Sequence, residues 1–232
     1  MSVIAANLQA VTKRIAAATQ QAGRNPSAVL LLAVSKTVSP AAVRAAFAAG
    51  QTAFGENYVQ EGLDKIAALD DLRAQIQWHF IGPLQSNKTR PVAERFDWVH
   101  AIDRLKIAQR LSDQRPEGLP PLQVCIQVNI SGEDSKSGVA PAEVLALARE
   151  IAALPRLRLR GLMAIPEAED DPGAQRRPFA AMHALLATLR EAGLDVDTLS
   201  MGMSGDMDAA IAEGATMVRI GTAIFGARPP KD

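Results

Sequence analysis

Cysteine is almost absent from the 232-residue chain, in which Cys125 is the only one. A single thiol excludes an intrachain disulfide and a cysteine-based metal site, and it suits a reducing compartment. Histidine is also scarce. The three histidines have no paired spacing with one another or with carboxylates, so we expect no histidine metal site.

Net charge is absent as well, because 25 basic residues balance 25 acidic ones. No run of like charge is long enough to hold a polyanion or an anionic membrane, which argues against nucleic acid as a partner. The longest apolar run, residues 28–34, is too short to cross a bilayer, and no basic stretch leads into an apolar core near the N-terminus. We therefore expect a cytoplasmic protein with no membrane partner.

The hydrophobic residues, 48% of the chain, fall into short runs that alternate with helical patterns. Apolar residues from Val3 to Ala18 recur at helical spacing, and Gly23 and Pro26 end the pattern, which predicts an N-terminal helix. Strand-like runs follow at 28–35, 52–57, 76–82, 97–102, 122–130, 157–165, 197–201 and 217–220. The helical patterns between them cover 40–50, 58–69, 88–96 and 177–192 or begin at 103, 141 and 206, and a short helix is expected in the C-terminal tail.

Continuous apolar strands separated by helices indicate a parallel sheet covered by helices. Eight such units in about 200 residues fit a (β/α)8 TIM barrel, here a single domain over 1–232 with an additional N-terminal helix. A doubly wound open sheet is the alternative. The chain has no Gly-x-Gly-x-x-Gly fingerprint and no P-loop, so the usual nucleotide-binding forms of an open sheet lack support.

Lys36 directly follows the first apolar strand, at the barrel face where functional groups gather. An amine desolvated at such a strand end is nucleophilic toward carbonyl groups, because burial favours its neutral form. The alternative is a lysine whose apolar stem packs on the protein while its ammonium reaches solvent.

Two glycine-rich segments, 200–206 and 219–226, follow the last two strands, where barrels commonly build a phosphate site. Their glycines permit close backbone approach, their hydroxyls offer hydrogen bonds, and Asp206 is positioned to begin a helix. Ordinary turn glycines and a helix cap are the alternative. The candidate phosphate-binding residues are Ser200, Gly202, Ser204, Gly205, Gly221 and Thr222.

A strand-end lysine and a phosphate site at one barrel mouth fit a phosphate-bearing aldehyde, of which pyridoxal phosphate (PLP) is the common example. Arg219 lies two residues before Gly221, so its side chain should point the same way. A permanent cation at the pyridine nitrogen would keep that nitrogen unprotonated and weaken the ring as an electron sink. An ion pair inside the barrel is the alternative for Arg219. An aldolase-like barrel, in which Lys36 attacks a substrate carbonyl without a cofactor, is the alternative for the whole site.

The sequence resembles a known family, the YggS/PROSC pyridoxal phosphate homeostasis proteins. The resemblance spans nearly the whole chain and is carried by AVSK (33–36), FGENYVQE (54–61), WHFIGPLQSNK (78–88), SMGMSGD (200–206) and RIGTAIFGAR (219–228). It implies a barrel similar to the N-terminal domain of alanine racemase, with PLP bound covalently to Lys36. It further implies that Asn57 and His79 line the ring pocket, that Arg219 faces the pyridine nitrogen, and that the phosphate is held by Ser200, Ser204, Gly221 and Thr222.

The resemblance implies a protein that binds, sequesters and delivers PLP, and not an efficient enzyme. A racemase needs two bases flanking the substrate α-carbon. The similar alanine racemases use a second domain and a tyrosine, whereas this sequence has no second β-rich domain and only one tyrosine, Tyr58. A weak amino-acid racemase or a related PLP enzyme is the alternative.

The expected partners are PLP and PLP-dependent apoenzymes, and we expect a monomer. Lys136, in the polar loop 131–138, and Lys231 are candidates for a second PLP site. A plain solvated loop is the favoured interpretation for 131–138.

Overall fold

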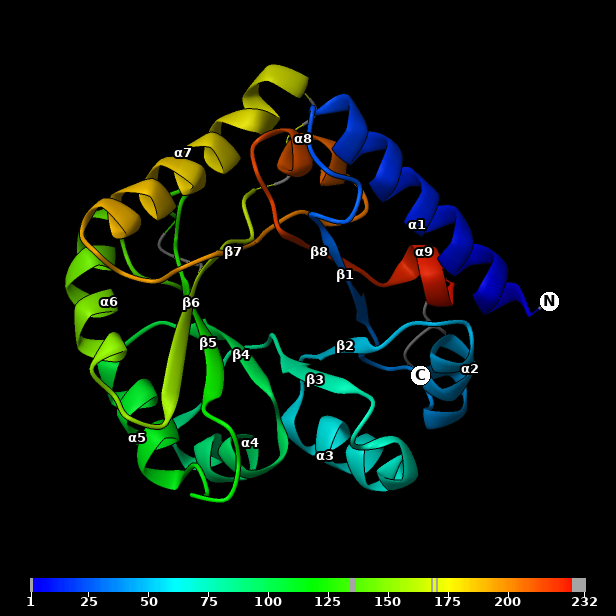
Figure 1. Ribbon diagram of the computed structural model, residues 1–232, viewed down its shortest axis with the longest axis horizontal. Helices are drawn as coiled ribbons and strands as arrows, with labels where there is room; N and C mark the ends of the chain where they lie inside the picture. The colour runs from blue at the N-terminus through cyan, green and yellow to red at the C-terminus, as the bar shows by residue number, and fades with distance from the viewer. Residues whose placement is uncertain (1, 134–136, 168, 170, 227–232) are drawn as a thin grey trace.

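A computed structural model describes residues 2–133, 137–167, 169 and 171–226. Eight parallel strands close into a barrel in chain order, and the last strand pairs with the first (Figure 1). The predicted (β/α)8 barrel is therefore confirmed. The strands are β1 (Leu30–Val34), β2 (Ala53–Glu56), β3 (Gln77–Phe80), β4 (Trp98–Ile102), β5 (Leu122–Gln127), β6 (Leu157–Met163), β7 (Thr198–Ser200) and β8 (Met217–Ile220).

Helices surround the barrel as an outer ring (Figure 1). Among the helices that the structure describes, none is long and apolar enough to cross a membrane. The α-helices are α1 (Val3–Gln21), α2 (Pro40–Ala48), α3 (Val59–Ala68), α4 (Thr89–Arg95), α5 (Leu105–Gln114), α6 (Val144–Ala152), α7 (Pro172–Glu191), α8 (Met207–Ala212) and α9 (Thr222–Phe225), with short 3-10 turns at Asp70–Leu72, Ser86–Lys88 and Pro141–Glu143.

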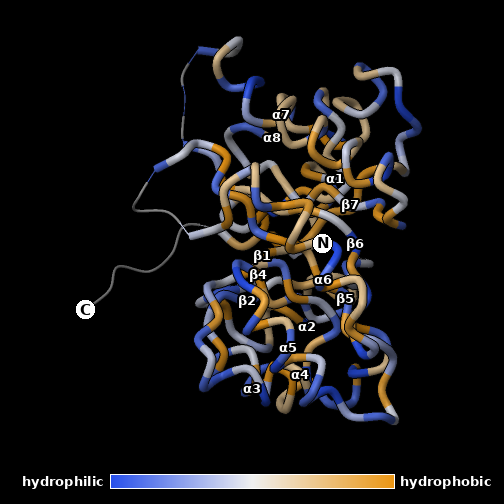
Figure 2. Tube along the Cα trace, turned by 90° about the vertical axis from the view of Figure 1, so that its left-hand side faces the viewer, coloured by the Kyte–Doolittle hydropathy of each residue, from blue (hydrophilic) through white to orange (hydrophobic). Residues whose placement is uncertain are grey.

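The apolar residues form two separate clusters, because successive side chains of a strand point to opposite faces. The larger cluster fills the layer between strands and helices, and Figure 2 shows hydrophobic colour concentrated in the interior of the trace. In β3, Trp78 and Phe80 belong to this layer. The side chain between them, His79, instead stacks on Trp98, a member of the small cluster inside the barrel.

Helix α1 confirms the predicted N-terminal helix and packs across α8 and α9 (Figure 1). The Asn7 amide donates a hydrogen bond to the Ile224 carbonyl over 3.0 Å. Arg14 donates to the Ser204 carbonyl over 3.1 Å and forms an ion pair with Asp208 over 2.7 Å. The helix therefore fastens the two segments that follow β7 and β8.

One predicted helix start differs from the structure by several residues, and one predicted short helix is confirmed. Helix α7 begins at Pro172, before the predicted start near 177, because the Asp171 carboxylate accepts the Ala174 N–H over 2.7 Å and caps an earlier turn. The short helix expected in the C-terminal tail is α9, which follows β8 directly.

Candidate functional site

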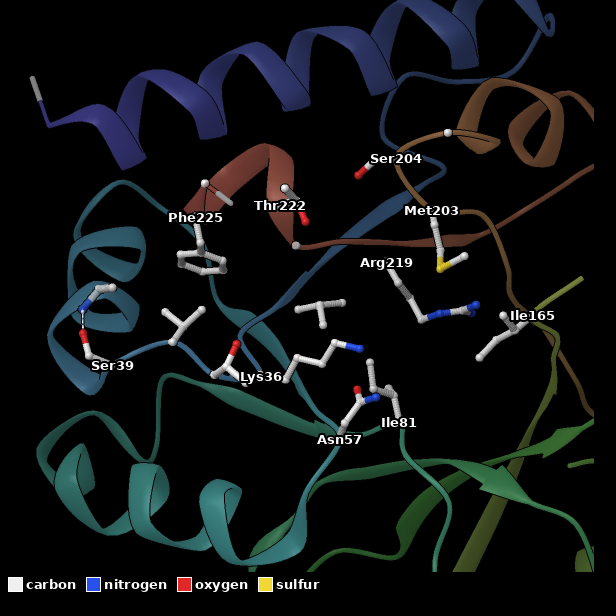
Figure 3. A pocket seen from close by; sticks show the side chains of 17 residues that line it. Lys36, Ser39, Asn57, Ile81, Ile165, Met203, Ser204, Arg219, Thr222 and Phe225 are labelled. Carbon is white, nitrogen blue, oxygen red and sulfur yellow. Dashed lines mark hydrogen bonds between the residues drawn. The ribbon is translucent and has the colours of Figure 1, made fainter. Parts of the chain in front are cut away.

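A cavity of about 490 Å³ opens where the barrel strands end, a size typical of small-molecule sites (Figure 3). Its walls come from segments that follow β1, β2, β3, β6 and β7 and from β8 with the residues after it. Six of the eight site residues that the family resemblance implies line this cavity: Lys36, Asn57, Ser204, Arg219, Gly221 and Thr222.

Lys36 stands two residues beyond Val34, the last residue of β1. Its side chain extends into the cavity toward the side from which Arg219 approaches (Figure 3). Val34 and Val38 line the cavity on either side of it in the sequence, so the stem of the lysine lies among apolar groups. This is the strand-end environment that the sequence predicts.

Arg219 is a buried cation on β8, with 5% of its surface exposed. It donates to the Ser200 carbonyl over 2.6 Å, to the Ser200 hydroxyl over 2.9 Å and to the Ala164 carbonyl over 2.8 Å. Within the described residues, no carboxylate forms an ion pair with Arg219. Burial lowers the pKa of Arg219 to about 10, and the negative charge of Asp206 opposes this lowering. The described residues therefore do not show the ion-pair alternative, and the guanidinium lines the cavity without a carboxylate in direct contact.

Asn57 follows the last residue of β2 and lines the cavity opposite the glycine-rich segments (Figure 3). Its side-chain oxygen is buried and has no hydrogen-bond partner among the described residues. A buried polar atom without a partner is uncommon in a folded protein. The amide is therefore available to a polar group in the cavity.

Two of the three hydroxyl-bearing residues of the predicted phosphate site, Ser204 after β7 and Thr222 at the start of α9, line the same cavity (Figure 3). Gly205 and Gly221 line it beside them. A Cβ atom at Gly221 would stand 3.1 Å from the Val34 carbonyl oxygen, so the glycine lets the end of β8 approach the end of β1 closely. The sequence prediction is therefore correct that segments 200–206 and 219–226 meet at one mouth.

His79 and Ser200 are not among the residues that line the cavity; both are fully buried. Their contact with the cofactor stays a prediction. His79 lies two residues before Ile81, and it is Ile81 that reaches the wall. The Ser200 hydroxyl is already engaged by Arg219 and by His100, at 2.9 Å each. Ser200 thus holds Arg219 in place.

The two buried histidine rings continue this hydrogen-bond chain, with 2.9 Å between His79 Nδ1 and His100 Nε2. Burial lowers the pKa of His79 to about 3. Burial, followed by the nearby His79 and Arg219, lowers the pKa of His100 well below its usual value. Both rings are therefore neutral near pH 7 and link β3 and β4 to the Ser200 end of β7.

Apolar wall residues were missed by the sequence reasoning. Ile81, Ile165, Met203 and Phe225 all line the cavity. Ile81 and Ile165 each come shortly after a strand, and this position is the signal that would have identified them. A search for polar residues alone does not identify them, because most of a ligand pocket is apolar.

Comparison with known proteins identifies the family of this chain. The alanine racemase N-terminal domain family matches residues 6–229. A pyridoxal phosphate homeostasis protein of Pseudomonas aeruginosa is 64% identical over 232 residues, which cover 98% of this chain and 97% of the relative. The chain belongs to the pyridoxal phosphate homeostasis protein family. The resemblance stated from its motifs is confirmed.

Solved structures give the same picture of the family. PipY of Synechococcus elongatus, a structure with PLP bound, is 38% identical with a TM-score of 0.84, and the match covers 96% of this chain and 100% of PipY. Alanine racemase of Corynebacterium glutamicum shares the fold with a TM-score of 0.71 and 21% identity. The match covers 98% of this chain but 62% of that racemase.

The remaining candidates concern a second PLP site and a metal site. Lys136 and Lys231, the predicted candidates for a second PLP site, lie outside the described residues. Among the residues that are described, no group of three or more His, Cys, Asp or Glu side chains is placed to hold a metal ion.

Proposed function

We propose that this chain binds PLP covalently through Lys36 in a reversible Schiff base, and that it sequesters the cofactor and delivers it to PLP-dependent apoenzymes. The observation that carries the proposal is one cavity lined by Lys36, by Arg219 and by the hydroxyl-bearing residues Ser204 and Thr222. The names of its relatives support the same function. We expect the carrier to act as a cytoplasmic monomer.

The residues present fit PLP in charge and shape. The cavity holds an amine for the aldehyde, and Arg219 faces it without an ion-pair partner among the described residues. The buried Asn57 oxygen lacks a partner within the described part of the chain. The Ser204 and Thr222 hydroxyls, with Gly205 and Gly221 beside them, suit a phosphate group. Apolar side chains at the remaining walls suit an aromatic ring.

PLP supplies an aldehyde that an amine can hold reversibly with loss of one water. In this chain Lys36 would supply that amine, and the Ser204 and Thr222 hydroxyls would hold the phosphate. Arg219 stays protonated because its pKa remains near 10 despite burial. A guanidinium held at the pyridine nitrogen would disfavour a proton there and so weaken the electron withdrawal that PLP enzymes use.

The cavity walls favour a carrier over a racemase. Lys36 and Arg219 are the only ionisable side chains among the described residues that line the cavity. Racemisation needs a second acid–base group on the opposite face of the substrate. Tyr58 does not provide it, because its side chain lies outside the cavity lining and the residue is 56% exposed.

The test measures the binding of PLP by the protein and the transfer of PLP to an apoenzyme. We expect wild-type protein titrated with PLP to develop Schiff-base absorption, and the loaded protein to restore activity to an added PLP-dependent apotransaminase. Lys36→Ala, loaded and desalted in the same way, should restore none. In parallel, D- and L-amino acids are incubated with the loaded protein and analysed by chiral chromatography.

Two results would contradict the proposal. Turnover of any amino acid at ordinary enzymatic rates, on the order of 1 s⁻¹ or faster, would make the protein a PLP enzyme. Protein that stays colourless with PLP, and in which Lys36 forms an adduct with a carbonyl substrate, would favour the aldolase-like alternative.

A further inference from the structure

A cluster of buried charges lies directly behind the turn that carries Lys36. Lys65 of α3 is 3% exposed, and Glu56 at the end of β2 is fully buried. The Lys65 ammonium donates to the two Glu56 oxygens over 2.9 and 3.0 Å and to a Glu61 oxygen over 2.5 Å. It also donates to the Ser35 carbonyl over 2.5 Å. One carboxylate and one ammonium thus bind Ser35, the residue that precedes Lys36, and Glu61 binds the same ammonium.

The same cluster also holds the residue that follows Lys36. The Thr37 N–H donates to Glu61 over 2.5 Å, and the Ser35 hydroxyl donates to Glu56 over 2.5 Å. Thr37 has a φ of 63°, and it is the only non-glycine residue of the described chain with a positive φ. A β-branched residue in the left-handed region is an outlier that persists only where its surroundings impose it.

These contacts do not reach the cavity itself. Glu56, Glu61 and Lys65 are not among the lining residues, so they act on a ligand only through the turn. Burial of charge is a poor way to gain stability, since apolar side chains of similar volume often serve as well or better. Burial raises the pKa of Glu56, and the Lys65 ammonium and the Ser35 hydroxyl oppose that rise. The cluster therefore fixes the backbone at Ser35 and Thr37, and the desolvation of its buried charges opposes folding.

We propose that Glu61 and Lys65 are positioning residues, which hold Thr37 in its left-handed conformation and so set where the Lys36 amine enters the cavity. The inference rests on the proposed function, in which Lys36 is the PLP tether. It assigns to α3 a part in cofactor binding although no side chain of that helix lines the cavity.

The first test removes the acceptor of the Thr37 N–H. Glu61→Ala is suitable because the side chain is 28% exposed, so folding should survive. We expect the affinity for PLP, measured by Schiff-base absorption, to fall about tenfold. Glu61→Gln keeps an oxygen acceptor and should stay within about threefold of wild type. Asp64→Ala, an exposed position on the same helix whose carboxylate bonds Gln60, is the matched control and should leave affinity unchanged.

The second test is a rescue by glycine. Because glycine adopts the left-handed conformation without a side-chain penalty, Thr37→Gly in the Glu61→Ala background should recover affinity to within about threefold of wild type. If Glu61→Ala fails to fold, Glu61→Asp, which keeps the charge but withdraws the carboxylate, takes its place with the same expectations.

A third measurement is made without the cofactor. Amide hydrogen exchange at Thr37, followed by NMR in PLP-free protein, should be slow in wild type and Asp64→Ala and fast in Glu61→Ala. Unchanged PLP affinity in Glu61→Ala, or no recovery with Thr37→Gly, would overturn the inference while wild-type binding at Lys36 stands. Absence of any Lys36 adduct in wild type would instead overturn the proposed function, and the inference with it.

Discussion

Under the proposed function, Arg219 is the residue whose environment would distinguish this site from one built to stabilise carbanions. Its three hydrogen bonds go to a hydroxyl and to main-chain carbonyls, which carry no net charge to compensate the guanidinium. The sequence predicts its direction correctly from its spacing to Gly221. It did not predict that Ser200 supports Arg219 from below, because the register between neighbouring strands decides which side chains meet.

Reversing the charge at this position tests the role of Arg219. With Arg219→Glu, a carboxylate facing the pyridine nitrogen would favour its protonation, so the Schiff-base spectrum should change. Side reactions with added amino acids should rise about tenfold, as ~1.4 kcal/mol of added stabilisation would give. Arg219→Lys keeps the positive charge and should retain a spectrum close to wild type. An unchanged spectrum in Arg219→Glu would show that residue 219 does not reach the ring.

At the scale of elements, all eight strands and the barrel closure could be predicted because their apolar runs are short, regular and separated by helical patterns. Helix ends were less predictable, as the Asp171 cap of α7 illustrates. Side-chain contacts between different elements could not be predicted. The Arg14 bond to Ser204 and the Glu61 bond to Thr37 join residues on different elements, and no local pattern encodes such pairs.

One contact between elements gives a direct prediction. A Cβ atom at Gly82, after β3, would lie 2.1 Å from the Asn57 carbonyl oxygen, after β2. Gly82→Ala should therefore displace Asn57, weaken PLP binding about tenfold and lower the free energy of unfolding by roughly 1–3 kcal/mol. Absorption titration and urea denaturation measure the two effects.

The matched control is Gly118→Ala, because a Cβ atom there meets nothing within 4 Å. It should leave PLP affinity unchanged and the free energy of unfolding equal to wild type or slightly higher. Equal PLP affinity in Gly82→Ala and Gly118→Ala would show that Asn57 does not depend on this packing.

The whole molecule keeps two neutral histidines inside the barrel, which links its stability to pH. His79 has a folded-state pKa of about 3, and that of His100 is also lowered by burial. The unfolded chain takes up these protons below about pH 6.5. The folded state binds these protons only at much lower pH. The stability contributed by the neutral rings is therefore fully present above about pH 6.5 and is lost as pH falls toward 3.

This linkage predicts a measurable loss of stability in mild acid. Between pH 7 and pH 5 each ring should contribute a loss of at most about 2 kcal/mol in the free energy of unfolding. His79→Phe keeps an aromatic ring against Trp98 but removes one titrating group. Between pH 7 and pH 5 the free energy of unfolding of His79→Phe, measured by urea denaturation, should fall by up to about 2 kcal/mol less than that of wild type. An equal loss in both proteins would contradict neutral burial of His79.

The most direct measurement of the central claim is to saturate the protein with PLP, reduce it with borohydride and map the modified peptide by mass spectrometry. We predict a pyridoxyl group on the peptide that contains Lys36. It should be absent from Lys36→Ala and retained in Lys13→Ala, a change on the exposed face of α1. A pyridoxyl group found on Lys136 or Lys231 with none on Lys36 would contradict the account.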